Sequence, residues 1–347
     1  MNIRKIIKFV EGVIRVYRLS GGFHEEERKM LDLHYTSIKK IGIEALQIVM
    51  MVDGRCVHGG LADRIRGIVT VYDYCKEKGI PFYLHYVYPF KLEDYFEPNR
   101  YDWRITDKQI SYHPEEALPV LLQVKLLPNK LHRLYLNHLI SKYPERQLHI
   151  YSNALFADSR FSQNFSDLFR PTFRLQEALS VQVTHISEPY IAMVFRFQQL
   201  LGDFKEDGYQ ILSVRKQKEL IEKCINKVEE LYVLYHSGQK ILVTSDSITF
   251  LETIKKQKNY VSIIPGKVVH MDYTSEAEYE VYMKSFIDLL MLSKAEKIYL
   301  LQTGDMYRSG FAKRAAKINN APYEEIVFYL KSATIIQYTI KGRFMSR

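Results

Sequence analysis

The sequence predicts an α/β fold in two domains, each built around a parallel sheet. Short apolar runs bounded by turn residues alternate with longer amphipathic segments, which is the pattern of parallel α/β domains. The chain has 347 residues, more than one hydrophobic core usually serves. A proline-containing stretch at residues 187–189 precedes a new apolar run. We therefore expect one domain at residues 1–187 and a second at residues 188–347.

The first half begins its sheet with the apolar run 45–54, which we expect to be a strand. A helix is predicted at 61–79, ending at Gly79 because glycine commonly follows the last helical residue. Two further runs, 80–88 and 146–152, have the length and apolar content of buried strands. The intervening residues 88–129 are rich in proline, tyrosine and charge, so we expect an irregular surface excursion there.

The second half shows a more regular alternation of strands and helices. Strands are predicted at 188–197, 240–247, 260–264 and 297–303, and helices at 214–238, 248–257, 275–296 and 309–319. This half therefore has the organisation of an α/β domain with a parallel sheet.

Composition and charge narrow the classes of partner. The net charge of +9 is spread along the chain and favours anionic ligands in general. The three cysteines lack the spacing of metal ligands, which predicts no metal site and a reduced, intracellular setting. Basic–aromatic platforms and helix-turn-helix patterns are absent from the sequence, so nucleic acid is not the expected partner.

The first 19 residues predict a basic amphipathic helix. Charges interrupt every apolar run there, so the segment does not read as a signal peptide, and no run in the chain reaches the about 18 residues that span a bilayer. A packed terminal helix is the first interpretation, and peripheral contact with a membrane surface is the alternative. We expect a cytoplasmic protein, peripheral to the membrane in the second case.

The stretch VHGGLADRIRGI, residues 57–68, is a candidate anion site of the first half. Gly59 and Gly60 follow a predicted strand and precede a helix, where backbone N–H groups and the helix dipole favour negative charge. Arg64 and Arg66 lie about one turn after Gly60, on the predicted helix. The alternative is a tight turn whose arginines are solvated on the helix surface.

The second half offers candidates at the carboxyl ends of its strands, where ligands bind in open parallel sheets. Arg196 stands in an apolar strand and needs an anionic partner, either a ligand phosphate or a structural ion pair. Asp246 and Ser247 follow the next strand, and either one could instead cap the helix that begins near Ile248. The stretch 303–311 follows the last predicted strand.

Taken together and in order, these motifs resemble those of the GT-B fucosyltransferases of the α1,6, α1,2 and protein-O class. HGGLADRIRGI resembles their amino-terminal glycine–arginine motif, and VFRF followed by GDFKE resembles their first nucleotide-sugar motif. VTSDS resembles the second, and residues 286–316 the third. The likeness covers roughly residues 53–316, and it implies two Rossmann-like domains facing across a cleft, with GDP-fucose held mainly by the second.

The resemblance implies a set of donor-binding residues. Arg196 matches the arginine that binds the β-phosphate and stabilises the departing GDP. Asp288 matches the aspartate that reads the guanine edge. The other donor-binding matches are Gly59, Gly60, Arg64, Asp246, Ser309, Gly310 and Phe311. Two further donor-site candidates are Ser247, beside Asp246, and His58, as a substitute imidazole for the one that the family has near its arginine. One departure concerns Val194, which stands where the family has a histidine.

The resemblance also implies an inverting transfer without a metal or other cofactor, with GDP-fucose as donor and a glycan, here expected to be bacterial, as acceptor. Asp203 and Glu206, just beyond Arg196, are the candidates for a catalytic base, and a capping or solvated carboxylate is the alternative for each. Two other functions remain open. One is transfer from a different nucleotide sugar, and the other is non-catalytic binding of a nucleotide or polyanion.

Overall fold

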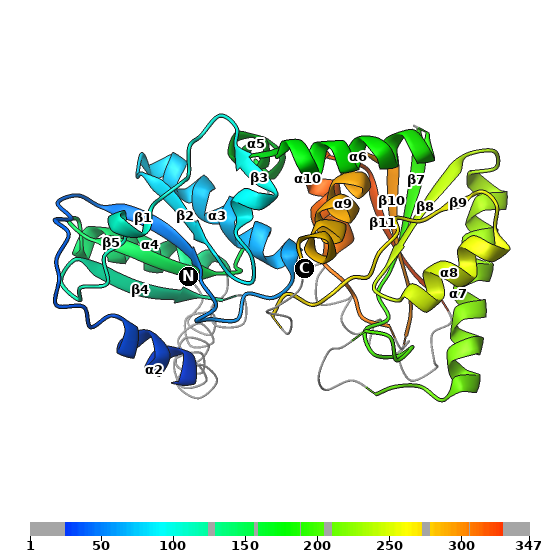
Figure 1. Cartoon of the computed structure of the whole chain (residues 1–347), viewed down its shortest axis with the longest axis horizontal. Helices are drawn as coiled ribbons and strands as arrows, with labels where there is room; N and C mark the ends of the chain where they lie inside the picture. Colours follow the sequence, from blue (N-terminus) through cyan, green and yellow to red (C-terminus); the bar gives the residue numbers. More distant parts are fainter. Residues whose placement is uncertain are drawn as a thin grey trace, which may run out of the picture. The chain divides into compact units, whose positions relative to one another are not determined.

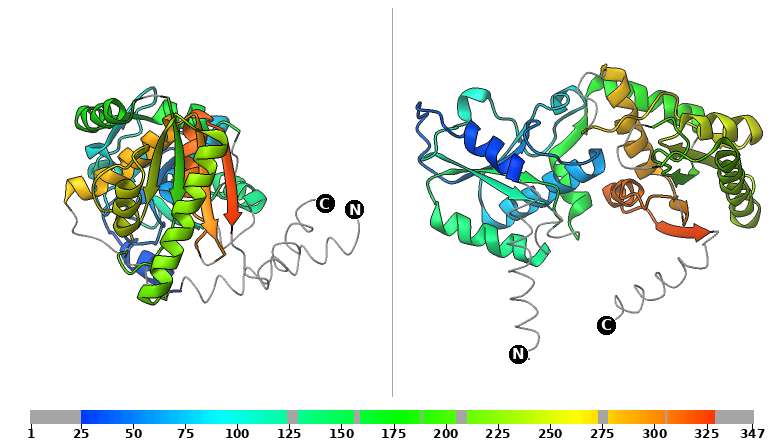
Figure 2. Two further views of the ribbon diagram at one scale, coloured as in Figure 1. Left: turned by 90° about the vertical axis from the view of Figure 1, so that its right-hand side faces the viewer. Right: turned by 90° about the horizontal axis from the view of Figure 1, so that it is seen from below.

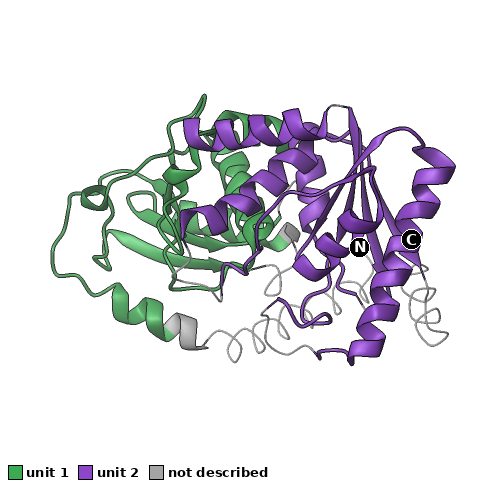
Figure 3. Cartoon of the chain, turned by 45° about the vertical axis from the view of Figure 1, so that its right-hand side comes forward, with its two compact units in different colours: residues 1–172 green, residues 173–347 purple. Residues whose placement is uncertain are grey.

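The computed structural model describes residues 25–123, 129–155, 159–187, 189–204, 210–272, 278–304 and 306–328. The predicted amino-terminal amphipathic helix and Glu206 lie outside these residues. The chain divides into two compact units, residues 1–172 and 173–347 (Figure 3). Within the described residues, no helix combines the length and apolar character that crossing a membrane requires.

The boundary between the units lies one helix earlier than the sequence suggests. Helix α6 (Phe173–Ile186) belongs to the second unit because it packs on α9 (Tyr279–Lys294) of that unit. Arg174 strengthens this contact, since its guanidinium lies 3.8 Å from the centre of the Tyr279 ring and pairs with Glu280. The proline-containing stretch near residue 188 is therefore a connection within the second unit and not the boundary.

The first unit contains a parallel four-stranded sheet in the order β2-β1-β5-β4 (Figure 1). The predicted strands and the helix that ends at Gly79 are present. Two short strands, β3 and β6, form a separate antiparallel pair. The elements are α2 (Glu25–His34), β1 (Gln47–Val52), α3 (Leu61–Lys78), β2 (Phe82–Tyr86), η1 (Leu92–Asp94), β3 (Phe96–Pro98), η2 (Asp107–Gln109), β4 (Ala117–Leu122), α4 (Asn129–Lys142), β5 (Gln147–Ser152), α5 (Phe161–Leu168) and β6 (Phe169–Pro171).

The second unit contains a parallel five-stranded sheet in the order β11-β10-β7-β8-β9. All four predicted strands and all four predicted helices of this half are present. Besides α6 and α9, its elements are β7 (Tyr190–Phe195), α7 (Val214–Tyr235), β8 (Lys240–Ser245), α8 (Ile248–Gln257), β9 (Val261–Ser262), β10 (Lys297–Thr303), α10 (Phe311–Asn319) and β11 (Tyr323–Phe328).

Helices cover both faces of this second sheet, as Figure 1 and the right-hand view of Figure 2 show. On one face, Ile191, Met193 and Phe195 of β7 join a buried apolar cluster with side chains of α7 and α8. On the other face, the Tyr190 hydroxyl donates to the Met291 carbonyl oxygen of α9 at 2.6 Å. Because side chains alternate along a strand, even-numbered residues of β7 point toward α9. This alternation decides which face each candidate residue occupies.

The excursion predicted at residues 88–129 is only partly irregular, because it contains the edge strand β4. Pro119 lies within this strand, and the proline content of the segment is one reason why an irregular excursion was expected. Proline is tolerated there because an edge strand leaves one side of its backbone unpaired. The last strand, β11, is also an edge strand and was not predicted.

Glu116 precedes β4 and holds a loop against the amino end of the sheet. Its carboxylate accepts the backbone N–H groups of Ile41, Gly42 and Ile43 at 2.9, 2.8 and 3.3 Å, and the Ser111 hydroxyl at 2.7 Å. Burial raises the pKa of Glu116, but these four donors outweigh burial and lower it to about 2. The carboxylate is therefore a structural anchor.

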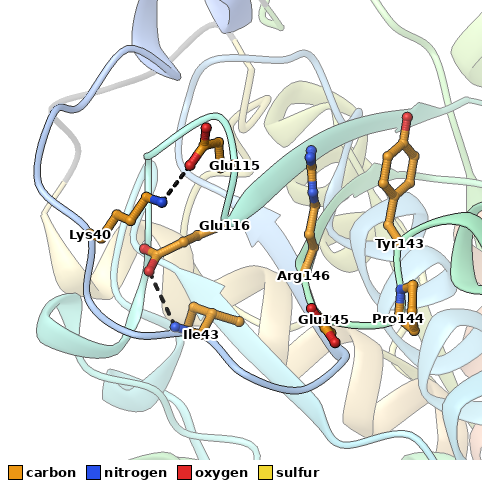
Figure 4. Close-up of a pocket in the computed structure, with 8 residues that line it drawn as sticks. All are labelled: Lys40, Ile43, Glu115, Glu116, Tyr143, Pro144, Glu145 and Arg146. Carbon is orange, nitrogen blue, oxygen red and sulfur yellow. Dashed lines mark hydrogen bonds and ion pairs between the residues drawn. The ribbon is translucent and has the colours of Figure 1, made fainter.

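This anchor lines a pocket of about 370 Å³, drawn in Figure 4 with the neighbouring Lys40–Glu115 ion pair. Glu116 and Arg146 directly precede β4 and β5, so the pocket lies at the amino edge of the first sheet. Ligands of open parallel sheets bind at the opposite, carboxyl edge. We therefore do not assign this pocket to the candidate site.

We expect Glu116→Gln to lower the free energy of unfolding at pH 7 by about 1–3 kcal/mol, because a buried acceptor is lost. Since the folded pKa lies below the ordinary value of 4.5, the native carboxylate stabilises the fold above pH 4.5 and loses this effect as the pH falls toward 2. Urea unfolding at pH 7 and pH 3 should thus show a difference between variant and wild type that shrinks at pH 3. Glu115→Gln is the matched control, because that exposed neighbour should change stability little. If the two variants lower the free energy of unfolding equally at pH 7, the structural role assigned to Glu116 is wrong.

Candidate functional site

The carboxyl edge of the second sheet contains the point where the strand order reverses. From the central strand β7, the chain continues to β8 and β9 on one side and then returns to β10 and β11 on the other. The carboxyl ends of β7 and β10 therefore border a crevice of the kind in which open α/β sheets bind ligands. Arg196 directly follows β7, Asp246 follows β8, and residues 304–310 connect β10 to α10.

Arg196 has a protein partner in this structure. Its guanidinium Nη1 lies 3.0 Å from Asp246 Oδ2, and its side chain is 17% exposed. The guanidinium carbon lies 4.3 Å from the centre of the Phe204 ring, which adds a cation–π contact. The structural ion pair is thus present. A guanidinium carries five N–H donors in a rigid fork, so pairing with a carboxylate is compatible with binding a second anion.

Asp246 fixes the backbone that follows β7. Its Oδ1 accepts the N–H of Phe197 at 2.8 Å, and its Oδ2 accepts the N–H of Gln198 at 2.7 Å. Burial raises the pKa of the Asp246 carboxyl, while Arg196 and these two N–H groups act in the opposite direction. Gln198 has a φ of +53°, an uncommon conformation for a residue other than glycine. Asp246 therefore holds a strained turn beside Arg196, and such turns cluster at functional sites.

Ser247, and not Asp246, caps helix α8. The Ser247 hydroxyl accepts the N–H of Phe250 at 3.1 Å and donates to Asp203 Oδ2 at 2.8 Å. The same Asp203 oxygen accepts the N–H of Thr249 at 2.9 Å. Asp203 thus stabilises the first turn of this helix by accepting two hydrogen bonds at Oδ2. Its other oxygen, Oδ1, is buried and has no hydrogen-bond partner among the residues that the structure describes.

Ser309, Gly310 and Phe311 form the start of helix α10 at the same edge of the sheet. Gly310 is the N-cap residue, and the Ser309 hydroxyl accepts the N–H of Phe311 at 3.2 Å. A Cβ added at Gly310 would meet no atom within 4 Å. The first turn of a helix presents N–H groups that bind anions, so this terminus can receive a phosphate.

Asp288 is buried within the second unit, on α9. It is 3% exposed, and both carboxylate oxygens lie 2.6 Å from the Lys284 ammonium, which is also 3% exposed. Burial raises the pKa of Asp288, and Lys284 lowers it. In this structure the carboxylate that the resemblance assigns to guanine is occupied by a lysine of its own helix.

In the first unit, the candidate loop follows β1, whose carboxyl end lies at the reversal point between β1 and β5. Gly59 has a φ of +83°, and a Cβ there would lie 2.8 Å from Asp63 Oδ2, so the turn requires glycine. Gly60 is the N-cap residue of α3. His58 is 1% exposed, and its Nδ1 lies 3.4 Å from the Ser152 carbonyl oxygen of β5. The glycine turn before a helix is thus present as the sequence indicates.

Arg64 is buried, with 1% of its surface exposed, and it stabilises this loop. Its Nε donates to the Gly59 carbonyl at 2.9 Å, and its Nη1 donates to the Tyr88 carbonyl at 2.8 Å. The final glycine of the motif, Gly67, has a packing role, because a Cβ there would lie 2.2 Å from the Ser152 carbonyl oxygen. Much of the motif therefore builds the turn and the close contact between α3 and β5.

Two buried glutamines near Arg196 did not stand out in the sequence. Gln198 is 4% exposed, and Gln302 near the end of β10 is 2% exposed. The Nε2 atoms of both, and Oε1 of Gln302, are buried without a hydrogen-bond partner in the described part of the chain. The available signal was a glutamine close to the carboxyl end of the apolar strand KIYLLQT.

No family model and no curated protein sequence matches this chain. Solved structures do match it. The α-1,6-fucosyltransferase NodZ from Bradyrhizobium, co-crystallised with GDP, is similar over 78% of this chain and 91% of its own, with 12% identity and a TM-score of 0.52. The fucosyltransferase FUT1 of Arabidopsis thaliana in complex with GDP is similar over 94% of this chain and 79% of its own, with 13% identity and a TM-score of 0.52.

These likenesses show the fold. The chain has the mixed α/β architecture of GT-B fucosyltransferases, with a parallel sheet in each of two Rossmann-like units. The fold class predicted from the sequence is therefore confirmed, and so is the resemblance at the level of fold.

Proposed function

We propose that this chain is a glycosyltransferase that transfers fucose from GDP-fucose to a glycan. One observation carries the proposal: Arg196, held by Asp246, follows the central strand at the point where the strand order reverses, in a fold shared with fucosyltransferases crystallised with GDP. The amino terminus of α10 at the same edge is a second group that favours a phosphate.

The chemistry requires that negative charge on the departing diphosphate be stabilised. In the proposed mechanism Arg196 and the first N–H groups of α10 do this, and the acceptor oxygen attacks from the opposite side, which inverts the anomeric carbon. A preorganised contact of this kind typically contributes about 3–4 kcal/mol to lowering the barrier. No step in this mechanism needs a metal ion.

Asp203 is the proposed base for the acceptor hydroxyl, because Oδ2 is fixed by Ser247 and Thr249 while Oδ1 has a lone pair without a donor in the described chain. We expect Asp203→Asn to lower kcat for GDP release from GDP-fucose by about 10²-fold or more, with GDP affinity unchanged. The measurement is coupled GDP release across pH 5 to 9, together with thermal melting. A variant that loses stability but keeps kcat would assign Asp203 to helix capping alone.

Calorimetric titration of GDP into the full chain, with UDP and ADP as comparisons and EDTA present, tests the donor assignment. Selective binding of GDP supports it. Selective binding of UDP or ADP would favour a different nucleotide sugar, a possibility that the Asp288–Lys284 pair and Val194 give reason to include. Binding of GDP without any turnover of GDP-fucose over a panel of bacterial glycans would favour a non-catalytic nucleotide-binding protein.

A further inference from the structure

Gln302 is a buried amide whose hydrogen-bonding groups are not used within the protein. It is 2% exposed, and neither Nε2 nor Oε1 has a hydrogen-bond partner among the described residues. Native structures contain few such groups, since a buried donor or acceptor without a partner is costly, and each one calls for an explanation. One explanation is a ligand that supplies the partners.

The register of the sheet places Gln302 beside Arg196. Leu300 of β10 pairs with Val194 of β7, and Val194 pairs with Thr244 of β8. The pairing of β10 with β7 ends at Leu300–Val194, and continuing the same alignment by two residues brings Gln302, Arg196 and Asp246 to one level at the carboxyl edge. Neighbouring strands are about 4.8 Å apart, so Gln302 is one strand away from the proposed phosphate-binding arginine.

Alternation of side chains places Gln302 and Arg196 on the same face. Tyr299 and Leu301 of β10 belong to the apolar cluster shared with α7 and α8, so Gln302 points to the opposite face. Phe195 belongs to that cluster too, so Arg196 also faces away from it. The two side chains therefore share the α9 face at the crevice between β7 and β10.

The chemistry of an amide indicates what it would bind. Nε2 donates and Oε1 accepts, whereas a phosphate oxygen only accepts, so a phosphate cannot satisfy both atoms. Neighbouring hydroxyl groups of a sugar can donate to one and accept from the other. A sugar linked to a diphosphate places its hydroxyl groups next to that diphosphate, and Gln302 lies on the strand that neighbours the one followed by Arg196.

We propose that Gln302 is a specificity residue of the donor site, where its amide binds neighbouring hydroxyl groups of a sugar attached to the diphosphate. The inference rests on the proposed function, because it takes Arg196 as the diphosphate ligand. The sugar is either the ribose of the nucleotide or the transferred fucose, and the two are distinguished by the ligand that is titrated.

The test compares Gln302→Met, which keeps the length of the side chain and removes its polar atoms, with Thr244→Val. Thr244 is the matched control, because its hydroxyl is likewise buried without a partner among the described residues on the same face, one row deeper in the sheet. Both variants should melt at or above the wild-type temperature. Only Gln302→Met should lower the affinity for the nucleotide-sugar donor, by at least tenfold. The measurement is calorimetric titration with GDP-fucose, GDP and 2′-deoxy-GDP.

If Gln302→Met lowers the affinity for GDP-fucose but not for GDP, the amide binds fucose. If it lowers the affinity for GDP and the variant no longer distinguishes GDP from 2′-deoxy-GDP, the amide binds ribose. If the wild type binds GDP-fucose and Gln302→Met binds it equally tightly, this inference alone is overturned. Absence of nucleotide binding by the wild type overturns the proposed function and the inference with it. Gln302→Glu is the second variant should the first not fold. It keeps the shape of the side chain and replaces the amide N–H donor by a carboxylate beside the diphosphate. The affinity for GDP-fucose should therefore fall by at least as much.

Discussion

Replacing Arg196 with alanine should weaken GDP binding and donor turnover by about 10²–10³-fold. Arg196 lies at the reversal point of the second sheet, and its orientation is fixed by Asp246 at 3.0 Å and by the Phe204 ring. A diphosphate bound there loses its main positive charge in the variant. Calorimetric titration of GDP and steady-state release of GDP from GDP-fucose measure the two effects.

Arg196→Lys is the informative companion, because it keeps the charge and loses the planar fork that contacts a carboxylate and a phosphate together. We expect it to recover part of the affinity and little of the turnover. GDP affinity that is equal in wild type, Arg196→Ala and Arg196→Lys would remove this residue, and the carboxyl edge of the second sheet, from the donor site.

Replacing Asp246 with alanine should lower the free energy of unfolding by about 3–5 kcal/mol, the cost of leaving the other member of a buried ion pair uncompensated. Asp246 is 5% exposed and accepts two backbone N–H groups and the Ser245 hydroxyl as well as Arg196, so its removal leaves four donors without their acceptor. The measurement is urea unfolding at pH 7.

Arg196→Met separates the ion pair from the backbone contacts in the same experiment. It should cost less stability than Asp246→Ala, because the carboxylate keeps its bonds to Phe197 and Gln198. The double variant should be less destabilised than the sum of the single variants, since the two residues interact directly. Additive effects, or a loss below about 1 kcal/mol for Asp246→Ala, would contradict the role that we assign to this carboxylate.

The sequence predicted that Arg196 needs an anionic partner but could not identify it. Asp246 is 50 positions away, and only the parallel pairing of β7 with β8, in which Phe195 pairs with Ser245, brings the two side chains together. The order of strands within the sheet, which makes this edge a reversal point, is likewise a property of long-range pairing.

Asp288 illustrates a signal that was present and not used. The resemblance assigned this carboxylate to a ligand, but Lys284 is four residues earlier on the same helix, at the spacing that allows an ion pair. Arg64 illustrates the opposite case. Its helix position suggested a solvated or ligand-facing side chain, whereas the segment that follows β2 accepts a hydrogen bond from it at the Tyr88 carbonyl oxygen.

The turn after β7 has a consequence for the thermodynamics of binding. Asp246 fixes Phe197 and Gln198 when the protein folds, including the positive φ of Gln198. A ligand that binds at Arg196 therefore contacts backbone that is already ordered, and binding costs little conformational entropy of the protein. Loosening the turn should make association more enthalpic and less favourable in entropy, even where every group that touches the ligand is retained.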